Sequence, residues 1–153
     1  MLIGPVLHRE LECEAVLRSL PKWFGIEESL QTYARDSGKL PTFAIEQETK
    51  IVGFISLREH FSECWEVHCI AVISSERNKG IGTRLLKHSE QWLYAQGIKF
   101  LQVKTVAATV EDEYYAQTRE FYARRGYTPV EIFPTLWSPH SPALQLIKML
   151  TAI

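Results

Sequence analysis

The sequence predicts an α/β fold built on a mixed, mostly antiparallel sheet that is flanked by about four helices. Strand-like segments gather in the middle of the chain, and segments with helical periodicity lie before and after them. Gly and Pro residues separate these segments, but no long Gly, Ser or Pro-rich linker divides the chain. The expected order is β-α-α-β-β-β-α-β-α-β-β, with residues 1–153 in a single domain, because 153 residues is the length of one average domain.

The first half of the chain is expected to form a strand, two helices and a meander of three antiparallel strands. The residues that share one face of the first helix are Leu11, Ala15, Val16 and Leu20. Pro21 ends this helix because it cannot continue the backbone hydrogen bonds. The expected segments are, in order, Leu2–Leu7, Glu10–Leu20, Glu27–Arg35, Thr42–Glu46, Lys50–His60 and Cys64–Ile73.

The second half begins with an amphipathic helix after Gly82. Its apolar face is formed by residues at helical spacing, namely Leu85, Leu86, Ser89, Trp92 and Leu93. Gly97 is the expected end of this helix, because glycine readily adopts the left-handed conformation found there. The later segments are a strand at Ile98–Thr105, a helix at Tyr114–Arg125, and strands at Tyr127–Ile132 and Leu144–Leu150.

The overall composition excludes several classes of protein. With 46% apolar and 23% charged residues, the chain is neither disordered nor collagenous. Seventeen Lys and Arg against eighteen Asp and Glu give a net charge of −1, so no global field favours nucleic acid or an anionic membrane. No apolar stretch is long enough to cross a bilayer. The chain has an odd number of cysteines, namely Cys13, Cys64 and Cys69, and its first residues do not resemble a secretory signal. Both observations favour the cytoplasm. No metal site is expected.

The most informative segment, Trp65–Thr83, runs from a strand through a polar loop into a helix. The first turn of a helix leaves backbone N–H groups unpaired, and Gly80 and Gly82 let the backbone fold closely around an anion. Arg77, Lys79 and Arg84 add positive charge. The loop lacks the third glycine of a dinucleotide fingerprint and the Gly-Lys-Ser/Thr of a Walker loop. The spacing therefore predicts a different anion-binding loop, and the alternative is a tight turn with solvated charges.

These residues resemble the GNAT superfamily of N-acetyltransferases, whose acetyl-CoA loop reads Arg/Gln-x-x-Gly-x-Gly/Ala. The loop here is Arg77-Asn78-Lys79-Gly80-Ile81-Gly82. The apolar Ile70-Ala71-Val72 precedes it, and Phe121-Tyr122-Ala123-Arg124-Arg125-Gly126-Tyr127 matches the end of the family's fourth helix. The resemblance covers essentially the whole chain and implies a central sheet whose fourth and fifth strands are splayed apart.

The resemblance implies an acetyl-CoA site. Pantetheine would pair with the backbone of the fourth strand, and loop N–H groups would hold the diphosphate. A bulge in such a sheet leaves backbone groups unpaired, so a cleft is expected between Ile70–Val72 and Lys104–Val106. The implied cofactor-binding residues are Ile70, Ala71, Val72, Arg77, Asn78, Lys79, Gly80, Ile81, Gly82 and Thr83.

The resemblance also implies catalytic roles. Tyr122 occupies the position of the acid that protonates the departing thiolate, although it could instead belong to the apolar face of its helix. Glu66 occupies the position of the base that takes the proton of the amine, directly or through a water, and the alternative is an exposed strand residue. His68 shares the strand face of Glu66 and is the rival base. The N–H of Val72 would polarise the thioester carbonyl.

The chain departs from the family at Tyr115, where many members carry an Asn that reaches the cofactor; Thr118 could supply a hydroxyl instead. Trp23, Phe24 and Trp137 lie in segments that set acceptor specificity in the family, although aromatic residues of this kind are commonly core or dimer contacts. The acidic residues expected near them, which would attract a cationic amine, are Glu111, Asp112 and Glu113.

The expected function is transfer of an acetyl group from acetyl-CoA directly to a primary amine of a small molecule or peptide, without a metal. The alternatives are a catalytically silent acyl-CoA-binding sensor or interaction module, and transfer of a longer acyl group. A nucleic-acid patch at Arg77, Lys79, Arg84 and Lys87 is disfavoured by the net charge. The protein is expected to be a monomer or a homodimer, and an exposed strand at Leu144–Leu150 would permit pairing between two copies.

Overall fold

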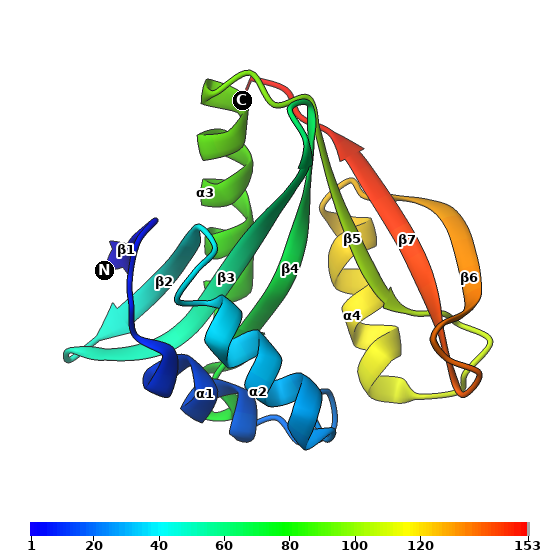
Figure 1. The fold of residues 1–153 in the computed structure, drawn as a ribbon, viewed down its shortest axis with the longest axis horizontal. Coiled ribbons are helices and arrows are strands. Elements are labelled where there is room, and N and C mark those ends of the chain that lie inside the picture. The colour runs from blue at the N-terminus through cyan, green and yellow to red at the C-terminus, as the bar shows by residue number, and fades with distance from the viewer. Residues whose placement is uncertain (153) are drawn as a thin grey trace.

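A computed structural model describes residues 1–152, which form one seven-stranded sheet and four α-helices (Figure 1). The order of the elements confirms the predicted α/β fold, with one added 3-10 turn before α3. The elements are β1 (Leu2–Ile3), α1 (Glu10–Arg18), α2 (Glu27–Asp36), β2 (Thr42–Gln47), β3 (Lys50–Phe61), β4 (Cys64–Val72), η1 (Ser74–Glu76), α3 (Ile81–Ala95), β5 (Phe100–Val106), α4 (Glu113–Arg124), β6 (Thr128–Ser138) and β7 (Ser141–Met149).

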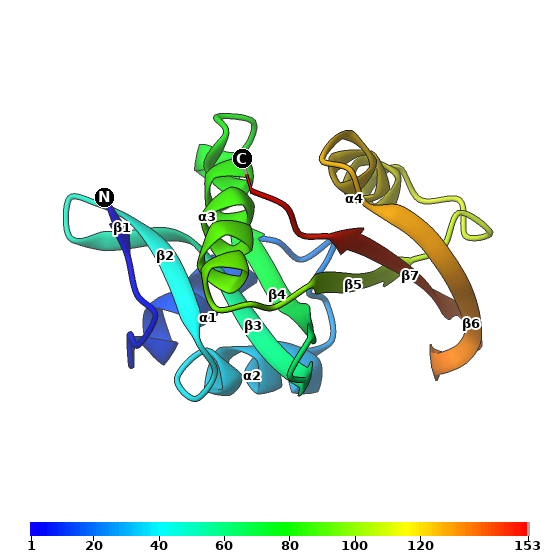
Figure 2. The ribbon, with the colours of Figure 1, turned by 90° about the horizontal axis from the view of Figure 1, so that it is seen from above.

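The sheet has the order β1-β2-β3-β4-β5-β7-β6, and every neighbouring pair except β4 and β5 is antiparallel. The parallel pair is short: Cys64–Glu66 of β4 pairs with Phe100–Gln102 of β5, and no pairing follows. Beyond this point the two strands diverge (Figures 1 and 2). The later half of β4 therefore has a backbone edge that β5 does not cover.

A β-bulge in β4 lies at the start of this divergence. Ser56 of β3 faces Cys69, whereas the next residue, Leu57, faces Val67, so His68 is an extra residue without a partner in β3. A bulge bends its strand and shifts the alternation of side chains by one residue. As a result, Val67 before the bulge and Ile70 after it both pack towards the α3 side of the sheet.

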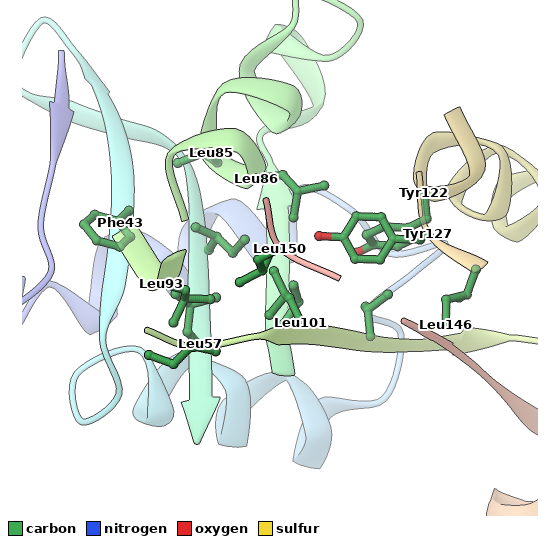
Figure 3. Packing of buried hydrophobic residues seen from close by; sticks show 14 of the residues in the cluster. Phe43, Leu57, Leu85, Leu86, Leu93, Leu101, Tyr122, Tyr127, Leu146 and Leu150 are labelled. Carbon is green, nitrogen blue, oxygen red and sulfur yellow. The ribbon is translucent and has the colours of Figure 1, made fainter. Parts of the chain in front are cut away.

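Helices cover both faces of the sheet. In Figure 2, α3 and α4 lie on one side and α1 and α2 on the other. The core under α3 contains fully buried side chains such as Leu57, Leu85 and Leu101, and it continues to Tyr122 and Tyr127 at α4 (Figure 3). The second core joins α1 and α2 to the opposite face through Cys13, Val16, Leu17, Leu20, Leu30, Ala34, Phe54, Cys69 and Ala71.

Three sequence-based expectations about the elements were wrong. Leu11 is 83% exposed, because the buried face of α1 passes through Cys13, Val16 and Leu17 instead. The first strand ends at Ile3, since Gly4 takes a left-handed φ of 131° and Pro5 has no N–H for the sheet. The segment Leu144–Leu150 is not at an edge: β7 lies between β5 and β6, and β6 is the exposed edge strand.

Candidate active site

A cleft of about 810 Å³ opens where β4 and β5 diverge. Ile70–Val72 lines one wall and Lys104–Val106 the other, which confirms the cleft expected between these segments. The loop before α3, the helix α4, the α1–α2 loop and the end of β6 complete it. The predicted site residues that line it are Trp23, Phe24, His68, Ile70, Ala71, Val72, Arg77, Asn78, Gly80, Ile81, Gly82, Thr83, Thr118, Tyr122 and Trp137.

The loop before α3 forms an anion-binding geometry at one end of the cleft. Gly80 has a φ of 83°, a left-handed conformation that glycine adopts without strain, and it caps the helix that starts at Ile81. The N–H groups of the first helical turn have no intrahelical partner and point out of the helix end. A Cβ at Gly82 would lie 3.4 Å from the Phe121 ring, which is ordinary van der Waals contact, so α3 and α4 lie close together at this point. Lys79 does not line the cleft and instead donates to Glu76 at 2.5 Å.

Two arginines bring positive charge to this end. The Arg77 guanidinium lies 4.2 Å from the centre of the Trp23 ring, and burial lowers the pKa of Arg77 without removing its charge. Arg125 follows α4, donates to the Thr83 hydroxyl through Nε at 2.9 Å, and lies 3.9 Å from the centre of the Phe121 ring. Sequence reasoning missed Arg125; its place beside Gly126, in the quoted end of the fourth helix, was the available signal.

Tyr122 lies in the deep part of the cleft. It is 2% exposed, and its ring makes edge-to-face contacts with Phe121 and Tyr127 at 5.3 and 5.5 Å between ring centres. Figure 3 shows the rings of Tyr122 and Tyr127 together at the end of the core. Burial raises the pKa of the Tyr122 phenol, so the hydroxyl stays protonated at neutral pH. Within residues 1–152 the hydroxyl has no hydrogen-bond partner, which leaves its proton available.

Glu66 is the last residue of β4 that pairs with β5, and both of its carboxylate oxygens have partners. Oε1 is 2.5 Å from Nε2 of His60, and Oε2 accepts from Nζ of Lys104 at 3.0 Å. The Glu66 side chain is 13% exposed and does not line the cleft, whereas Lys104 does. The carboxylate therefore offsets the charge of Lys104 and holds the His60 ring at the edge of the cleft.

His68, the bulge residue, lines the cleft directly. Its Nε2 is 2.8 Å from Oδ2 of Asp36, the last residue of α2, and its ring meets Tyr33 edge-on at 5.2 Å. Burial, together with the charge of Arg58, lowers the pKa of His68 despite the contact with Asp36. The neutral ring therefore donates from Nε2 to the carboxylate, which leaves Nδ1 as a free acceptor. Sequence reasoning missed Asp36, because this contact joins α2 to β4 across 32 residues.

The α1–α2 loop crosses the mouth of the cleft and is fastened to α4. Trp23 Nε1 donates to Oγ1 of Thr118 at 3.2 Å and to the backbone oxygen of Tyr114 at 3.3 Å. The Tyr115 hydroxyl donates a hydrogen bond to the backbone oxygen of Trp23 at 3.1 Å. Thr118 and Tyr115 thus hold the loop. Phe24 packs edge-on against Tyr33, 5.9 Å between ring centres.

The far rim of the cleft is apolar. Trp137, at the end of β6, is 46% exposed, and its neighbour Leu136 is 53% exposed. The acidic run at the start of α4 does not join this rim: Glu111, Asp112 and Glu113 line no part of the cleft. Asp112 instead caps α4, accepting from the N–H of Tyr114 at 2.8 Å.

Comparisons with known proteins agree with this geometry. Residues 8–127 match the model of a family described as Acetyltransferase (GNAT) family. A structure assigned to the GNAT family from Desulfovibrio desulfuricans superposes with a TM-score of 0.83 at 16% identity, over 99% of each chain. An aminoglycoside 6′-N-acetyltransferase complexed with coenzyme A has a TM-score of 0.76 at 20% identity, over 100% of this chain and 98% of that one. The ribosomal-protein-S18-alanine N-acetyltransferase from Escherichia coli has a TM-score of 0.74 at 19% identity, over 100% and 96%.

Proposed function

The chain belongs to the GNAT acetyltransferase family, and from this premise we propose that it transfers an acetyl group from acetyl-CoA directly to a primary amine. The observation that carries the proposal is the cleft between β4 and β5, which joins an anion-binding loop to a buried proton donor. A cleft of about 810 Å³ is in the range of sites that enclose a cofactor and a small substrate.

The residues around the cleft fit acetyl-CoA. The uncovered backbone edge at Ile70–Val72 offers donors and acceptors to a strand-like pantetheine chain. At one end, the N–H groups at the start of α3 and the guanidinium of Arg77 suit a diphosphate. Arg125 adds a second cation on the α4 side of the same end. When bound, acetyl-CoA supplies an activated thioester.

Tyr122 is the proposed acid. A thiol with a pKa near 8.5 leaves more readily when a proton is delivered to its sulfur, and the unpaired hydroxyl of Tyr122 retains its proton at neutral pH. Its ring is held by Phe121 and Tyr127, so the hydroxyl keeps one direction relative to β4.

The proposed base lies on the face of β4 that meets α2. An alkylammonium with a pKa near 10.4 costs about 4.6 kcal/mol to deprotonate at pH 7, so a nearby acceptor is needed. Glu66 would receive the proton through a water, because His60 and Lys104 hold its oxygens. His68 would receive it at Nδ1, with Asp36 stabilising the resulting charge. Both roles belong to the proposal, and the pH dependence of the two variants separates them.

The acceptor is proposed to be an amine of a small molecule or of a peptide. The structural neighbours are named for both kinds, an aminoglycoside and a ribosomal protein. The decisive experiment is a panel of amines in which thiol release from acetyl-CoA is measured and the acetylated product is identified by mass. Product formation that is lost in Tyr122→Phe supports the proposal. If CoA binds and no amine of the panel is acetylated, the chain is instead an acyl-CoA-binding module.

A further inference from the structure

The charge of the cleft wall discriminates between classes of amine. Within residues 1–152, Glu76 is the one carboxylate that lines the cleft, and Lys79 occupies it. Three cationic side chains line the same cleft, namely Arg77, Lys104 and Arg125. Lys104 is paired with Glu66 at 3.0 Å, so the uncompensated positive charge of the wall comes from Arg77 and Arg125.

A cationic wall suits the phosphates of CoA but opposes an acceptor with several ammonium groups. Each ammonium that leaves water needs a carboxylate or several oxygen acceptors as partners, and an unpaired one is strongly disfavoured. Two carboxylates near His68 already have partners: Asp36 contacts His68 and Arg58, and Glu66 contacts His60 and Lys104. Glu28 lines an adjoining hollow of about 260 Å³ beside Tyr33 and His68 and has no ion-pair partner among residues 1–152. One amino group can be matched there, and a second or third would find no unpaired carboxylate among the lining residues.

Two segments that line the cleft contribute large apolar side chains. Phe24 and Ile26 project from the α1–α2 loop, and Leu136 and Trp137 project from the end of β6. Ile26 is 70% exposed, and Leu136 and Trp137 are about half exposed, so this surface has no partner within residues 1–152. Apolar groups that stay exposed around a hollow commonly mark a binding surface.

We infer that the acceptor is a primary amine with one charged nitrogen on an apolar body of aromatic size, and that polycationic amines are rejected. This inference rests on the proposed function and specifies its acceptor. The amino group lies at the His68 end, and the apolar body lies between the α1–α2 loop and Trp137. A free arylalkylamine and a peptide N-terminus with a large apolar first residue share this chemistry.

The test compares acceptors that differ in their bodies. The probes are 2-phenylethylamine, 1,4-diaminobutane, kanamycin, and tripeptide amides that begin with Phe or with Lys. We expect kcat/KM for 2-phenylethylamine or for the Phe peptide to exceed that for 1,4-diaminobutane and kanamycin at least about tenfold. The better of these two probes identifies whether the amine is free or peptide-borne. A preference for 1,4-diaminobutane, kanamycin or the Lys peptide would overturn the inference and leave the acetyltransferase assignment intact.

Three variants make the test specific. Trp137→Ala is expected to lower kcat/KM for the apolar amine about tenfold and to leave KM for acetyl-CoA unchanged. Leu136→Glu, at an exposed position, adds a carboxylate to the rim. It should lower the ratio of kcat/KM for 2-phenylethylamine to kcat/KM for 1,4-diaminobutane. Phe61→Ala is the control, because Phe61 is an aromatic residue, 76% exposed, at the β3–β4 turn and outside the cleft. Equal effects of Trp137→Ala and Phe61→Ala would contradict the inference.

Binding separates a failure of the inference from a failure of the proposed function. If no amine is acetylated, the affinities of 2-phenylethylamine and 1,4-diaminobutane for the CoA complex are measured by titration calorimetry. Tighter binding of 2-phenylethylamine then supports the acceptor class although the proposed reaction has failed. Equal or weaker binding overturns the inference as well.

Discussion

Replacing Tyr122 with Phe tests the proposed acid with little disturbance of the fold. The ring is 2% exposed and packs against Phe121 and Tyr127, and the substitution keeps these contacts. The hydroxyl has no hydrogen-bond partner among residues 1–152, and it is not a buried unpaired atom, since Tyr122 lines the cleft; its removal therefore breaks no bond within the described residues. We therefore expect the free energy of unfolding of Tyr122→Phe to be nearly unchanged.

Catalysis should respond very differently. A positioned acid typically contributes about 10²–10⁴-fold to the rate, so kcat should fall by at least roughly 100-fold, while the affinity for CoA is unchanged. Because burial raises the pKa of Tyr122, the wild-type enzyme should show no loss of activity from this residue between pH 7 and 9.

The matched control is Tyr127→Phe, the same substitution five residues further along the chain. The Tyr127 hydroxyl donates to Oε2 of Glu90 at 2.6 Å in the buried core, and a hydrogen bond to a charged group is worth about 1.5–3 kcal/mol. The control should lower Tm by roughly 3–12 °C and keep kcat at temperatures where it is folded. Thiol release, CoA titration and thermal unfolding are measured on both variants. If Tyr122→Phe keeps more than half of kcat, the assignment of Tyr122 as the acid is wrong.

Three further predictions concern the anion-binding loop and the two proposed bases. Gly80→Ala should cost about 1–2 kcal/mol of stability and raise KM for acetyl-CoA, whereas Gly97→Ala, with a φ of 84° and equally open surroundings, should cost the same and leave KM unchanged. Because the pKa of His68 is lower in the folded chain than in the unfolded chain, the unfolded state binds more protons, and stability should fall as the pH drops below about 6.5. Urea unfolding should show a smaller difference between the free energies of unfolding at pH 5 and pH 7 for His68→Gln than for the wild type. The last prediction concerns the fall of kcat/KM at low pH, which reports protonation of the base. This fall should disappear in the variant of the true base, His68→Gln or Glu66→Gln. If both variants keep it, neither residue is the base.

The order of elements was predictable because it depends on local patterns. The helical spacing around Leu85 and the glycines that end α3 and α4 are written in short stretches of sequence. The place of β7 between β5 and β6 was not predictable, because it depends on pairing between distant residues such as Val103 and Leu146. The misassigned face of α1 has a similar cause. Leu11 and Val16 both fit a helical period, and tertiary packing selects the face with Cys13 and Leu17.

The candidate site was predictable where a motif carries it. The anion-binding loop follows from the spacing of Gly80 and Gly82, and the position of Tyr122 follows from the resemblance to the GNAT family; both line the cleft. The electrostatic partners do not follow from spacing. Lys104 approaches Glu66 from β5, and Asp36 approaches His68 from α2, so each contact exists only after the sheet and helices have packed. Deciding whether Glu66 or His68 takes the proton of the amine therefore needs the tertiary structure.

The bulge at His68 links the fold to the proposed chemistry. Parallel pairing with β5 ends at Glu66, two residues before the bulge, so the bend in β4 begins where the cleft opens. The extra residue also shifts the alternation of side chains, and Val67 and Ile70 both stay packed towards α3 while the strand changes direction. If β4 paired with β3 without a bulge, residues 70 and 72 would turn to the α2 side and His68 would have a partner in β3. One inserted residue thus frees the edge that suits pantetheine and puts an imidazole beside it, backed by Asp36.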